Sequence, residues 1–260
     1  MHTPRKRFGQ HFLCDQSIIH RIIDALHPKA AQHLIEIGPG QGALTVPMLQ
    51  QIKQLEVIEL DRDLVHELKH RNRENDDLIV HEADALEFDF ASLKNDDRLL
   101  RVFGNLPYNI STPLIFHLLN FSDIISDMLF MLQKEVAKRM AADAGSKDYG
   151  RLSVMVQYHC RVELLFDVPA SAFYPPPQVV SSIVKLVPHR EYPYRAQNYP
   201  LFESVVKHVF GQRRKTLRNS LREMIDDDVW AHINIRSDLR AENLSVKDFV
   251  EICNVMSARG

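Results

Sequence analysis

Cysteine is scarce in this sequence, with three residues among 260. Cys14, Cys160 and Cys253 lie far apart, with no CxxC pair and no paired histidines beside them. This spacing excludes a disulfide framework and a zinc site, so we expect no metal. A reducing cytosol is the natural compartment for such a chain, and we expect a cytoplasmic protein.

Long apolar runs are missing as well. No stretch approaches the roughly 18 consecutive apolar residues that indicate a membrane-spanning helix. The basic N-terminus, residues 1–7, is not followed by the apolar segment of about 7 to 15 residues that a signal peptide requires. We therefore predict neither a membrane span nor a signal peptide.

An excess of charge of either sign is also absent, because 32 Lys and Arg face 34 Asp and Glu, for a formal net charge of -2. A globally basic nucleic-acid-binding protein is excluded, so any such surface must be a local patch. With 45% hydrophobic and 25% charged residues, the chain is typical of globular proteins. Its length allows one large domain, or a medium domain with a small one.

Apolar runs alternate with helical segments through the first 140 residues. A helix is predicted over 16–26 from its apolar spacing. Strands are predicted at 33–37, 55–60, 78–81, 99–103 and 128–132, with helical segments at 43–49, 63–71, 112–119 and 134–142. This alternation favours an α/β fold, a Rossmann-like parallel sheet covered on both faces.

The pattern changes further along the chain. Residues 152–158 fit a helix or a strand, whereas 162–168 and 179–187 look extended, with a stiff proline segment at 170–177 that presents aromatic residues. Prolines break the pattern at 188–200, so we predict domains 1–188 and 189–260. The second is predicted to be smaller and all helical, with helices at 201–210, 216–225, near Trp230 and at 245–256, where Ser245 and Asp248 form a capping box.

A glycine loop, Gly38–Gly42, joins the first strand of the sheet to a helix. Strand, glycine loop and helix open a nucleotide-binding unit. The pattern Gly38-x-Gly40-x-x-Ala43 also fits the dinucleotide fingerprint of dehydrogenases, and a tight structural turn is a third interpretation. Glu59 follows Gly38 by 21 positions, where a carboxylate reaches ribose hydroxyls.

Three acidic residues are expected to surround this loop at the strand ends: Glu36, Glu59 and Asp84. A cationic, single-nucleoside ligand such as S-adenosylmethionine tolerates them better than a pyrophosphate does. Asp84 could accept from an adenine amino group, and Glu59 could bind both ribose hydroxyls. For each carboxylate alone, a solvated strand end is an equal alternative.

The segment Asn105-Leu106-Pro107-Tyr108 ends another predicted strand. Asn105 offers an amide acceptor, and Pro107 favours an extended Leu106 whose carbonyl can face a ligand. With the ring of Tyr108 as a stacking face, this arrangement suits an exocyclic amine such as N6 of adenine. The alternative is a polar turn before a helix capped by Ser111.

Six motifs taken together resemble the ribosomal RNA adenine N6,N6-dimethyltransferase family, and they span nearly the whole chain: Gln10–Leu13, Glu36–Gly42, Glu59–Asp61, Asn105–Tyr108, Phe173–Pro177 and Gln212–Thr216. Their order and spacing most resemble the bacterial branch that acts on small-subunit RNA. The resemblance implies a class I methyltransferase sheet with S-adenosylmethionine as methyl donor. It also implies dimethylation of two adjacent adenosines near the 3′ end of 16S ribosomal RNA, in small-subunit biogenesis. The implied partner is that RNA or a small-subunit precursor, and we expect a monomer.

The resemblance also implies roles for single residues. Contacts with the cofactor would come from His11, Leu13, Gly38, Glu59, Asp84 and Asn105. The target amine would face Asn105 and the Leu106 carbonyl, and the flipped adenine would lie between Tyr108 and Phe173. Many relatives carry Asn at the place of His11, so an amide contact there becomes an imidazole or backbone contact.

Basic residues gather in two places. An N-terminal arm holds Arg5, Lys6 and Arg7, and residues 190–223 carry eight cations against three anions. Within that second region, we predict RNA contacts for Arg213, Arg214, Lys215, Arg218 and Arg222. A solvated face is the alternative for both. Two other functions remain open, an NAD-dependent oxidoreductase and a ribosome-assembly factor without catalysis.

Overall fold

The computed structural model describes residue 5, residues 10–72 and residues 77–259. The chain divides into two compact units. The first, here called the sheet unit, comprises residues 1–137 and 163–188, and the second, the helical unit, comprises 138–162 and 189–260. The chain crosses from the sheet unit to the helical unit for the last time after Pro188.

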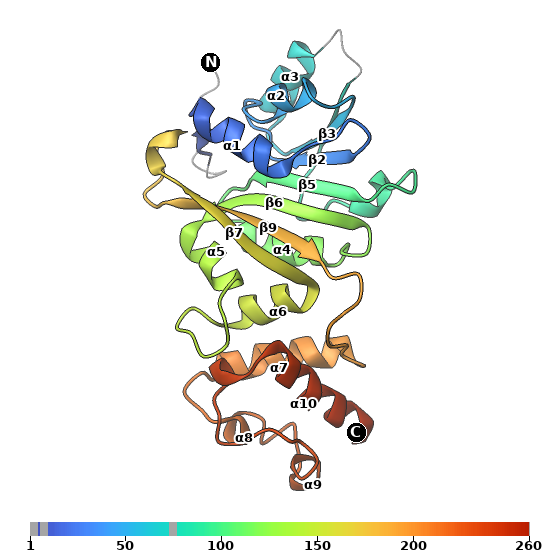
Figure 1. The fold of residues 1–260 in the computed structure, drawn as a ribbon, viewed down its shortest axis with the longest axis vertical. Helices are drawn as coiled ribbons and strands as arrows, with labels where there is room; N and C mark the ends of the chain where they lie inside the picture. Colours follow the sequence, from blue (N-terminus) through green and yellow to red (C-terminus); the bar gives the residue numbers. More distant parts are fainter. Residues whose placement is uncertain (1–4, 6–9, 73–76, 260) are drawn as a thin grey trace. The chain divides into compact units, whose positions relative to one another are not determined.

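A seven-stranded mixed sheet forms the sheet unit (Figure 1). Its first five strands in sheet order are parallel, and β9 runs antiparallel to β6. In sheet order the strands are β4 (Leu78–Glu82), β3 (Leu55–Glu59), β2 (His33–Ile37), β5 (Leu100–Asn105), β6 (Ile125–Gln133), β9 (Ser181–Pro188) and β7 (Cys160–Val168). The predicted α/β sheet is therefore confirmed. Strands β2 and β3 are buried throughout, as expected for parallel strands covered on both faces.

Helices cover this sheet, with α1 in front of it and α4 behind it in Figure 1. A second, two-stranded sheet pairs β1 with β8 antiparallel. The helices and short strands of this part are β1 (Phe12–Leu13), α1 (Gln16–Leu26), α2 (Thr45–Leu49), α3 (Arg62–Arg71), η2 (Phe90–Leu93), α4 (Ser111–Leu119), α5 (Lys134–Met140), η3 (Ala170–Ala172) and β8 (Phe173–Tyr174). A turn over residues 108–110 precedes α4, as in the alternative interpretation, but the N-cap of this helix is Ile110 rather than Ser111.

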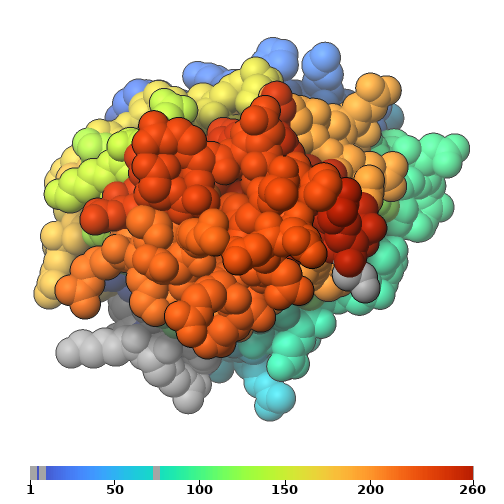
Figure 2. Space-filling view, turned by 90° about the horizontal axis from the view of Figure 1, so that it is seen from below, coloured from blue at the N-terminus to red at the C-terminus, as the bar shows by residue number. Residues whose placement is uncertain are grey.

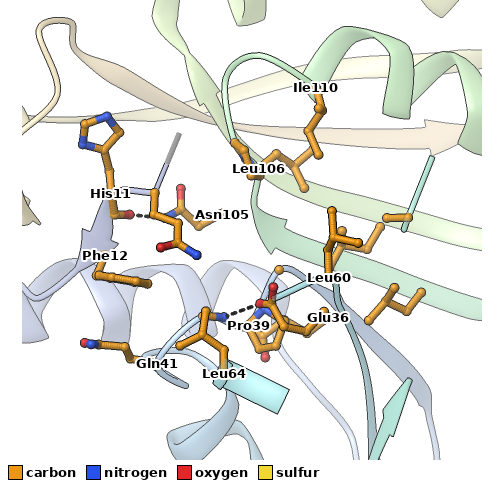
Figure 3. A pocket seen from close by; sticks show the side chains of 18 of the residues that line it. His11, Phe12, Glu36, Pro39, Gln41, Leu60, Leu64, Asn105, Leu106 and Ile110 are labelled. Atoms are coloured by element: carbon orange, nitrogen blue, oxygen red, sulfur yellow. Dashed lines mark hydrogen bonds between the residues drawn. The ribbon is translucent and has the colours of Figure 1, made fainter. Parts of the chain in front are cut away.

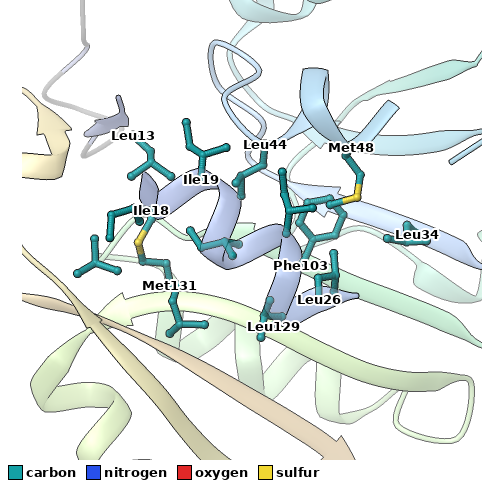
Figure 4. Close-up of a cluster of buried hydrophobic side chains, with 14 of the residues drawn as sticks. Leu13, Ile18, Ile19, Leu26, Leu34, Leu44, Met48, Phe103, Leu129 and Met131 are labelled. Carbon is teal, nitrogen blue, oxygen red and sulfur yellow. The ribbon is translucent and has the colours of Figure 1, made fainter. Parts of the chain in front are cut away.

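Helix α1 forms where the apolar spacing predicts it, over Gln16–Leu26. The side chain of its N-cap, Asp15, accepts from the backbone N–H groups of Ser17 and Ile18. These N–H groups would otherwise have no hydrogen-bond partner in the first turn of the helix. Its five buried apolar side chains pack on Phe103, Leu129 and Met131 of the sheet (Figure 4).

Arg101 fastens the other end of α1. Its guanidinium binds the buried Asp127 carboxylate through two bonds, of 2.7 and 2.9 Å, and donates to the Leu26 carbonyl at 2.7 Å. A further bond reaches the Gln32 amide oxygen at 2.6 Å. A buried ion pair is favourable only when its polar groups are satisfied, and here the last carbonyls of a helix satisfy them.

Helices form most of the second unit, whose surface is orange to dark red in Figure 2. Helix α10 packs on α6, α7 and α9. The helices are α6 (Arg151–His159), α7 (Tyr199–Gly211), α8 (Leu217–Ser220), α9 (Asp227–Trp230), η4 (Ala241–Asn243) and α10 (Val246–Arg259). The capping box of Ser245 and Asp248 is present before α10. Along the described residues, no helix is long and apolar enough to cross a membrane.

The predicted helix over 216–225 is wrong in extent, because only Leu217–Ser220 is helical. The backbone N–H groups of Leu217 and Arg218 donate to the carbonyls of Leu239 and Ser237. A return segment about 20 residues further along therefore holds the start of α8. Such long-range pairing overrides local helix propensity.

Gly104 lies where β5 comes closest to β2. A Cβ atom at this position would stand 2.3 Å from the carbonyl oxygen of Ile37, a distance that only glycine avoids. Any side chain at position 104 would push apart the ends of the two strands, which carry Gly38 and Asn105.

Gly104→Ala is therefore expected to lower the free energy of unfolding by roughly 1 to 3 kcal/mol, as for other overpacked sites. Urea unfolding measures the change. The matched control is Gly211→Ala, where nothing lies within 4 Å of the added Cβ atom. Equal stability of the two variants would show that β5 shifts without cost.

Candidate active site

One cavity of about 300 Å³ opens at the carboxyl ends of β2, β3, β4 and β5 (Figure 3). Parallel strands place their carboxyl ends at one edge of a sheet, so segments distant in sequence meet there. The lining includes every residue for which the sequence predicts a cofactor contact: His11, Leu13, Gly38, Glu59, Asp84 and Asn105. Leu106 and Tyr108 line the same cavity.

The glycine loop forms one wall of this cavity. Gly38, Gly40 and Gly42 have φ angles of +66°, +56° and +84°, a region that residues with a Cβ atom rarely adopt. The N–H of Gly40 donates to the Glu59 carboxylate at 3.2 Å. The loop and the end of β3 therefore hold each other in place.

Glu59 ends β3 with its side chain almost fully buried. Its carboxylate accepts from the N–H groups of Gly40 and Asp61, at 3.2 and 2.9 Å. Burial raises the pKa of Glu59, and these two backbone bonds partly counteract the rise. A carboxylate has about four acceptor sites. After these two bonds, Glu59 can therefore still accept hydrogen bonds from two hydroxyl groups of a ligand.

Asp84 follows β4 and is partly exposed to the cavity. One of its oxygens accepts from the N–H of Leu86 at 2.9 Å. This bond orients the carboxylate and leaves the second oxygen able to accept from a ligand amine.

Glu36 lines the cavity next to the end of β2, as expected, but it is buried rather than solvated. It lies inside β2 with 2% of its surface exposed, and its carboxyl accepts from the Thr45 hydroxyl at 2.6 Å. Burial raises the pKa of Glu36 to about 8, although the Thr45 bond lowers it in part. Glu36 therefore keeps its proton for the most part at neutral pH, so it adds little negative charge to the cavity.

Glu36→Gln tests this protonation. Between about pH 4.5 and 8 the native state keeps a proton that the unfolded state releases, so wild-type stability falls as pH rises, by up to roughly 1.4 kcal/mol per pH unit. The variant lacks this slope and should gain stability relative to wild type towards pH 8. Urea unfolding across this range measures the effect, with exposed Glu87→Gln as control. Parallel pH curves for wild type and Glu36→Gln would contradict a raised pKa.

Asn105 is the last residue of β5, and its orientation is fixed by the N-terminal arm. Its side-chain amide donates to the backbone carbonyl of His11 at 3.0 Å (Figure 3). Because a carbonyl only accepts, the amide nitrogen must face His11. The amide oxygen of Asn105 is thereby left as the acceptor.

The ring of Tyr108 is held by two contacts. Its hydroxyl hydrogen-bonds the Ser181 hydroxyl at 2.7 Å, and its face lies against the His11 imidazole, with 5.8 Å between ring centroids. Burial raises the pKa of Tyr108, and the Ser181 bond lowers it in part. The Nδ1 of His11 donates to the Pro175 carbonyl at 2.7 Å. His11 thus binds Asn105 through its backbone and approaches Tyr108 through its side chain.

Phe173 does not line the cavity. It pairs with Leu13 between β8 and β1, is 5% exposed and belongs to the apolar cluster under α1. Its neighbour Tyr174 is 66% exposed. In this conformation Tyr108 is therefore the aromatic residue of the predicted pair that reaches the cavity.

The predicted RNA contacts differ in how they are engaged. Arg5 forms ion pairs with Asp61, at 2.7 Å, and with Asp63, while Lys6 and Arg7 lie outside the described residues. In the helical unit, Arg213 lies 3.6 Å from Glu242 and Arg218 2.6 Å from Asp227. Three other cations of this group are exposed and form no ion pair with a described residue: Arg214, Lys215 and Arg222.

Sequence reasoning missed Ser181 and Gly104 as parts of this site. Ser181 lies 73 positions from Tyr108, and no local pattern indicates the bond between them. Gly104 directly precedes the predicted motif Asn105–Tyr108, but its role depends on the backbone of another strand.

The motif resemblance implies methyl transfer as the reaction, and Ser181→Ala should slow it by roughly 2- to 12-fold, the equivalent of one lost hydrogen bond of 0.5 to 1.5 kcal/mol. The affinity for the implied cofactor should be unchanged. Tyr108→Phe removes the same bond, so the double variant should be no slower than the slower single one. The control is Ser182→Ala, whose hydroxyl binds Asp167 instead. Independent, additive losses in the double variant would show that the bond does not position Tyr108.

Two solved structures that align with this chain are methyltransferases. The crystal structure of a dimethyladenosine transferase from Plasmodium falciparum aligns with a TM-score of 0.79 at 29% identity, over 93% of this chain and 96% of that one. The 23S rRNA methyltransferase ErmE aligns with a TM-score of 0.72 at 22% identity, over 95% of this chain and 99% of that one. The sheet therefore defines a class I methyltransferase.

Sequence comparison gives the family. Residues 1–258 match the family model of the ribosomal RNA adenine dimethylases, and the chain belongs to this family. It is 55% identical over 257 residues to the Ribosomal RNA small subunit methyltransferase A of Chromohalobacter salexigens, covering 97% of this chain and 91% of that protein. The protein of the same name from Pseudomonas putida is 53% identical over 256 residues, covering 98% and 96%. The resemblance inferred from the motifs is confirmed, and the chain is an enzyme that methylates adenine in ribosomal RNA.

Proposed function

We propose that the cavity binds S-adenosylmethionine and that the enzyme dimethylates N6 of two adjacent adenosines near the 3′ end of 16S ribosomal RNA. The observation that carries this proposal is the Asn105 amide, fixed as an acceptor on the cavity that Glu59 and Asp84 also line. The two small-subunit relatives favour this RNA over large-subunit RNA.

The side chains around the cavity suit this cofactor. Glu59 would bind the ribose hydroxyls and Asp84 the adenine amine. Gly38 would let the backbone approach the methionine portion. His11 and Leu13 would contact the cofactor from the N-terminal arm. When bound, S-adenosylmethionine supplies an electrophilic methyl group on a sulfonium, whose positive charge the two acidic residues favour.

The chain's own residues prepare the target amine. The N6 lone pair of adenine is delocalised into the ring, so the amine is a weak nucleophile. Acceptors at Asn105 and at the Leu106 carbonyl would each hold one N6 hydrogen and favour a tetrahedral nitrogen. Alignment of the reacting groups supplies much of the rate, up to about 7 to 11 kcal/mol in well-oriented systems, so no strong base is required.

The target base must leave its stack to reach this cavity, at a cost of a few kcal/mol that is lowest in a loop. Tyr108 would cover one face of the flipped adenine. Phe173, buried beside Leu13, is proposed as the second face, which requires that β8 shift when RNA binds. We expect a monomer in the cytoplasm that recognises the small-subunit RNA or its precursor particle through exposed cations of the helical unit.

An NAD-dependent oxidoreductase is the alternative that the glycine loop allows. It gives no role to the Asn105 acceptor or to Tyr108, and the family match disfavours it. A factor that binds RNA without catalysis is the other alternative, and methyl transfer separates it from the enzyme.

The experiment is single-turnover methylation of unmodified 16S ribosomal RNA or small-subunit particles. Asn105→Ala should slow the first transfer by roughly two orders of magnitude, as when a transition-state hydrogen bond is lost. Exposed Asn120→Ala, at the end of α4, is the matched control. Glu59→Ala should instead weaken S-adenosylmethionine binding by about 1.5 to 3 kcal/mol in a calorimetric titration. A near-wild-type transfer rate in Asn105→Ala would remove Asn105 from the mechanism.

A further inference from the structure

A second cavity, of about 520 Å³, lies within the helical unit along α10. One side consists of Tyr194 and Arg195, which precede α7, and the other of Lys247, Asn254 and Arg259 of α10. We call this cavity the α10 groove. It shares no residue with the active-site cavity or with the predicted contacts at 213–222.

Three cations of the α10 groove are exposed and unneutralised. Within the described chain, Arg195, Lys247 and Arg259 form no ion pair, and Glu251 is the acidic side chain that shares their groove. Several other arginines of the helical unit are paired, for example Arg236 with Asp238 and Arg218 with Asp227. Exposed cations without partners give up no intramolecular bond when they bind an anion, which makes them the better phosphate ligands.

The backbone beside Tyr194 and Arg195 is fixed before any ligand arrives. Asn254 accepts from the N–H of Gln197 at 2.8 Å and donates to the carbonyl of Arg195 at 3.0 Å. The N–H of Ala196, between them, donates to the Tyr158 hydroxyl at 3.2 Å. The two sides of the groove are thus tied together, which lowers the entropy cost of binding.

Tyr194 adds a stacking surface. It is 44% exposed and has no ring partner in the described structure, whereas the nearby Tyr192 and Tyr199 both pack on Tyr158. An exposed ring beside several cations is the combination that binds unpaired nucleotides, since bases stack on the ring while phosphates contact the cations.

We propose that the α10 groove binds an unpaired segment of ribosomal RNA, with phosphates at Arg195, Lys247 and Arg259 and one base on Tyr194. The proposal rests on the proposed function only in taking ribosomal RNA as the ligand. An acidic protein segment would use the cations but would not require an exposed aromatic ring.

The first experiment measures equilibrium binding of protein-free 16S ribosomal RNA over a range of KCl concentrations. Replacing all three cations, Arg195→Gln, Lys247→Gln and Arg259→Gln, should weaken binding at least tenfold. It should also reduce the slope of log affinity against log salt by about 2, since each lost phosphate contact removes roughly 0.7 to 0.9. Arg236→Gln, which removes a paired cation of the same unit, is the control and should change neither quantity. An unchanged slope in the triple variant overturns the proposal.

The second experiment uses Tyr194→Leu, which should weaken binding about fivefold or more without changing the salt slope. Unaltered affinity in this variant contradicts the stacking contact. If the triple variant loses affinity for small-subunit particles but not for protein-free RNA, the groove contacts a protein and the proposal is wrong. Binding of S-adenosylmethionine should not change in any of these variants. Because RNA binding is measured without methyl transfer, a failure of the groove is distinguishable from a failure of the proposed reaction.

Discussion

The close approach of β5 to β2 is the constraint on which the active site depends. At Gly104 the two backbones come so near that a Cβ atom would lie 2.3 Å from the Ile37 oxygen. The next residues of the two strands are Asn105 and Gly38, and a Cβ atom at Gly38 would lie 3.9 Å from the Asn105 carbonyl oxygen. The absence of one side chain thus brings Asn105, the proposed acceptor for the target amine, close to the loop that would hold the cofactor.

A second constraint comes from chain segments that lie far apart in sequence. The arm holds the Asn105 amide through the His11 carbonyl. The stretch from Pro175 to Ser181, the first residue of β9, holds both rings, His11 through the Pro175 carbonyl and Tyr108 through the Ser181 hydroxyl. Each bond fixes a group whose other side faces the cavity. The orientation of these groups is therefore set within the protein itself, as the proposed mechanism requires, in which a weak nucleophile is aligned without a strong base.

The sequence predicts the regular elements well where one local pattern decides them. Helix α1 and strand β2 have the predicted bounds, because apolar spacing and a short buried run are sufficient signals. The residues around the cavity were also predictable, since strand ends meet at one edge of a parallel sheet. Local pattern fails where partners are distant, as for the start of α8, which pairs with Ser237 and Leu239.

Burial is the other property that the sequence does not reveal. Glu36 was expected to be a charged strand end, but the sheet buries it and its pKa rises to about 8. Phe173 was expected beside the target base, but the sequence gives no sign that its ring packs with Leu13 in the core. In both cases the residue type was informative and the surroundings, set by other strands, changed what the side chain can do.

The number of basic residues in a segment likewise overstates how many of them are available to bind RNA. Residues 190–223 carry an excess of cations, but Arg213 lies near Glu242 and Arg218 pairs with Asp227, so part of the excess is neutralised within the protein. A paired arginine must exchange one anion for another when it binds phosphate, and the net gain is small. An unpaired cation beside an exposed ring gains both the phosphate contact and the stacking contact. We therefore expect ion pairing within the protein, rather than the number of charges, to decide which basic residues of this chain of net charge -2 contact RNA.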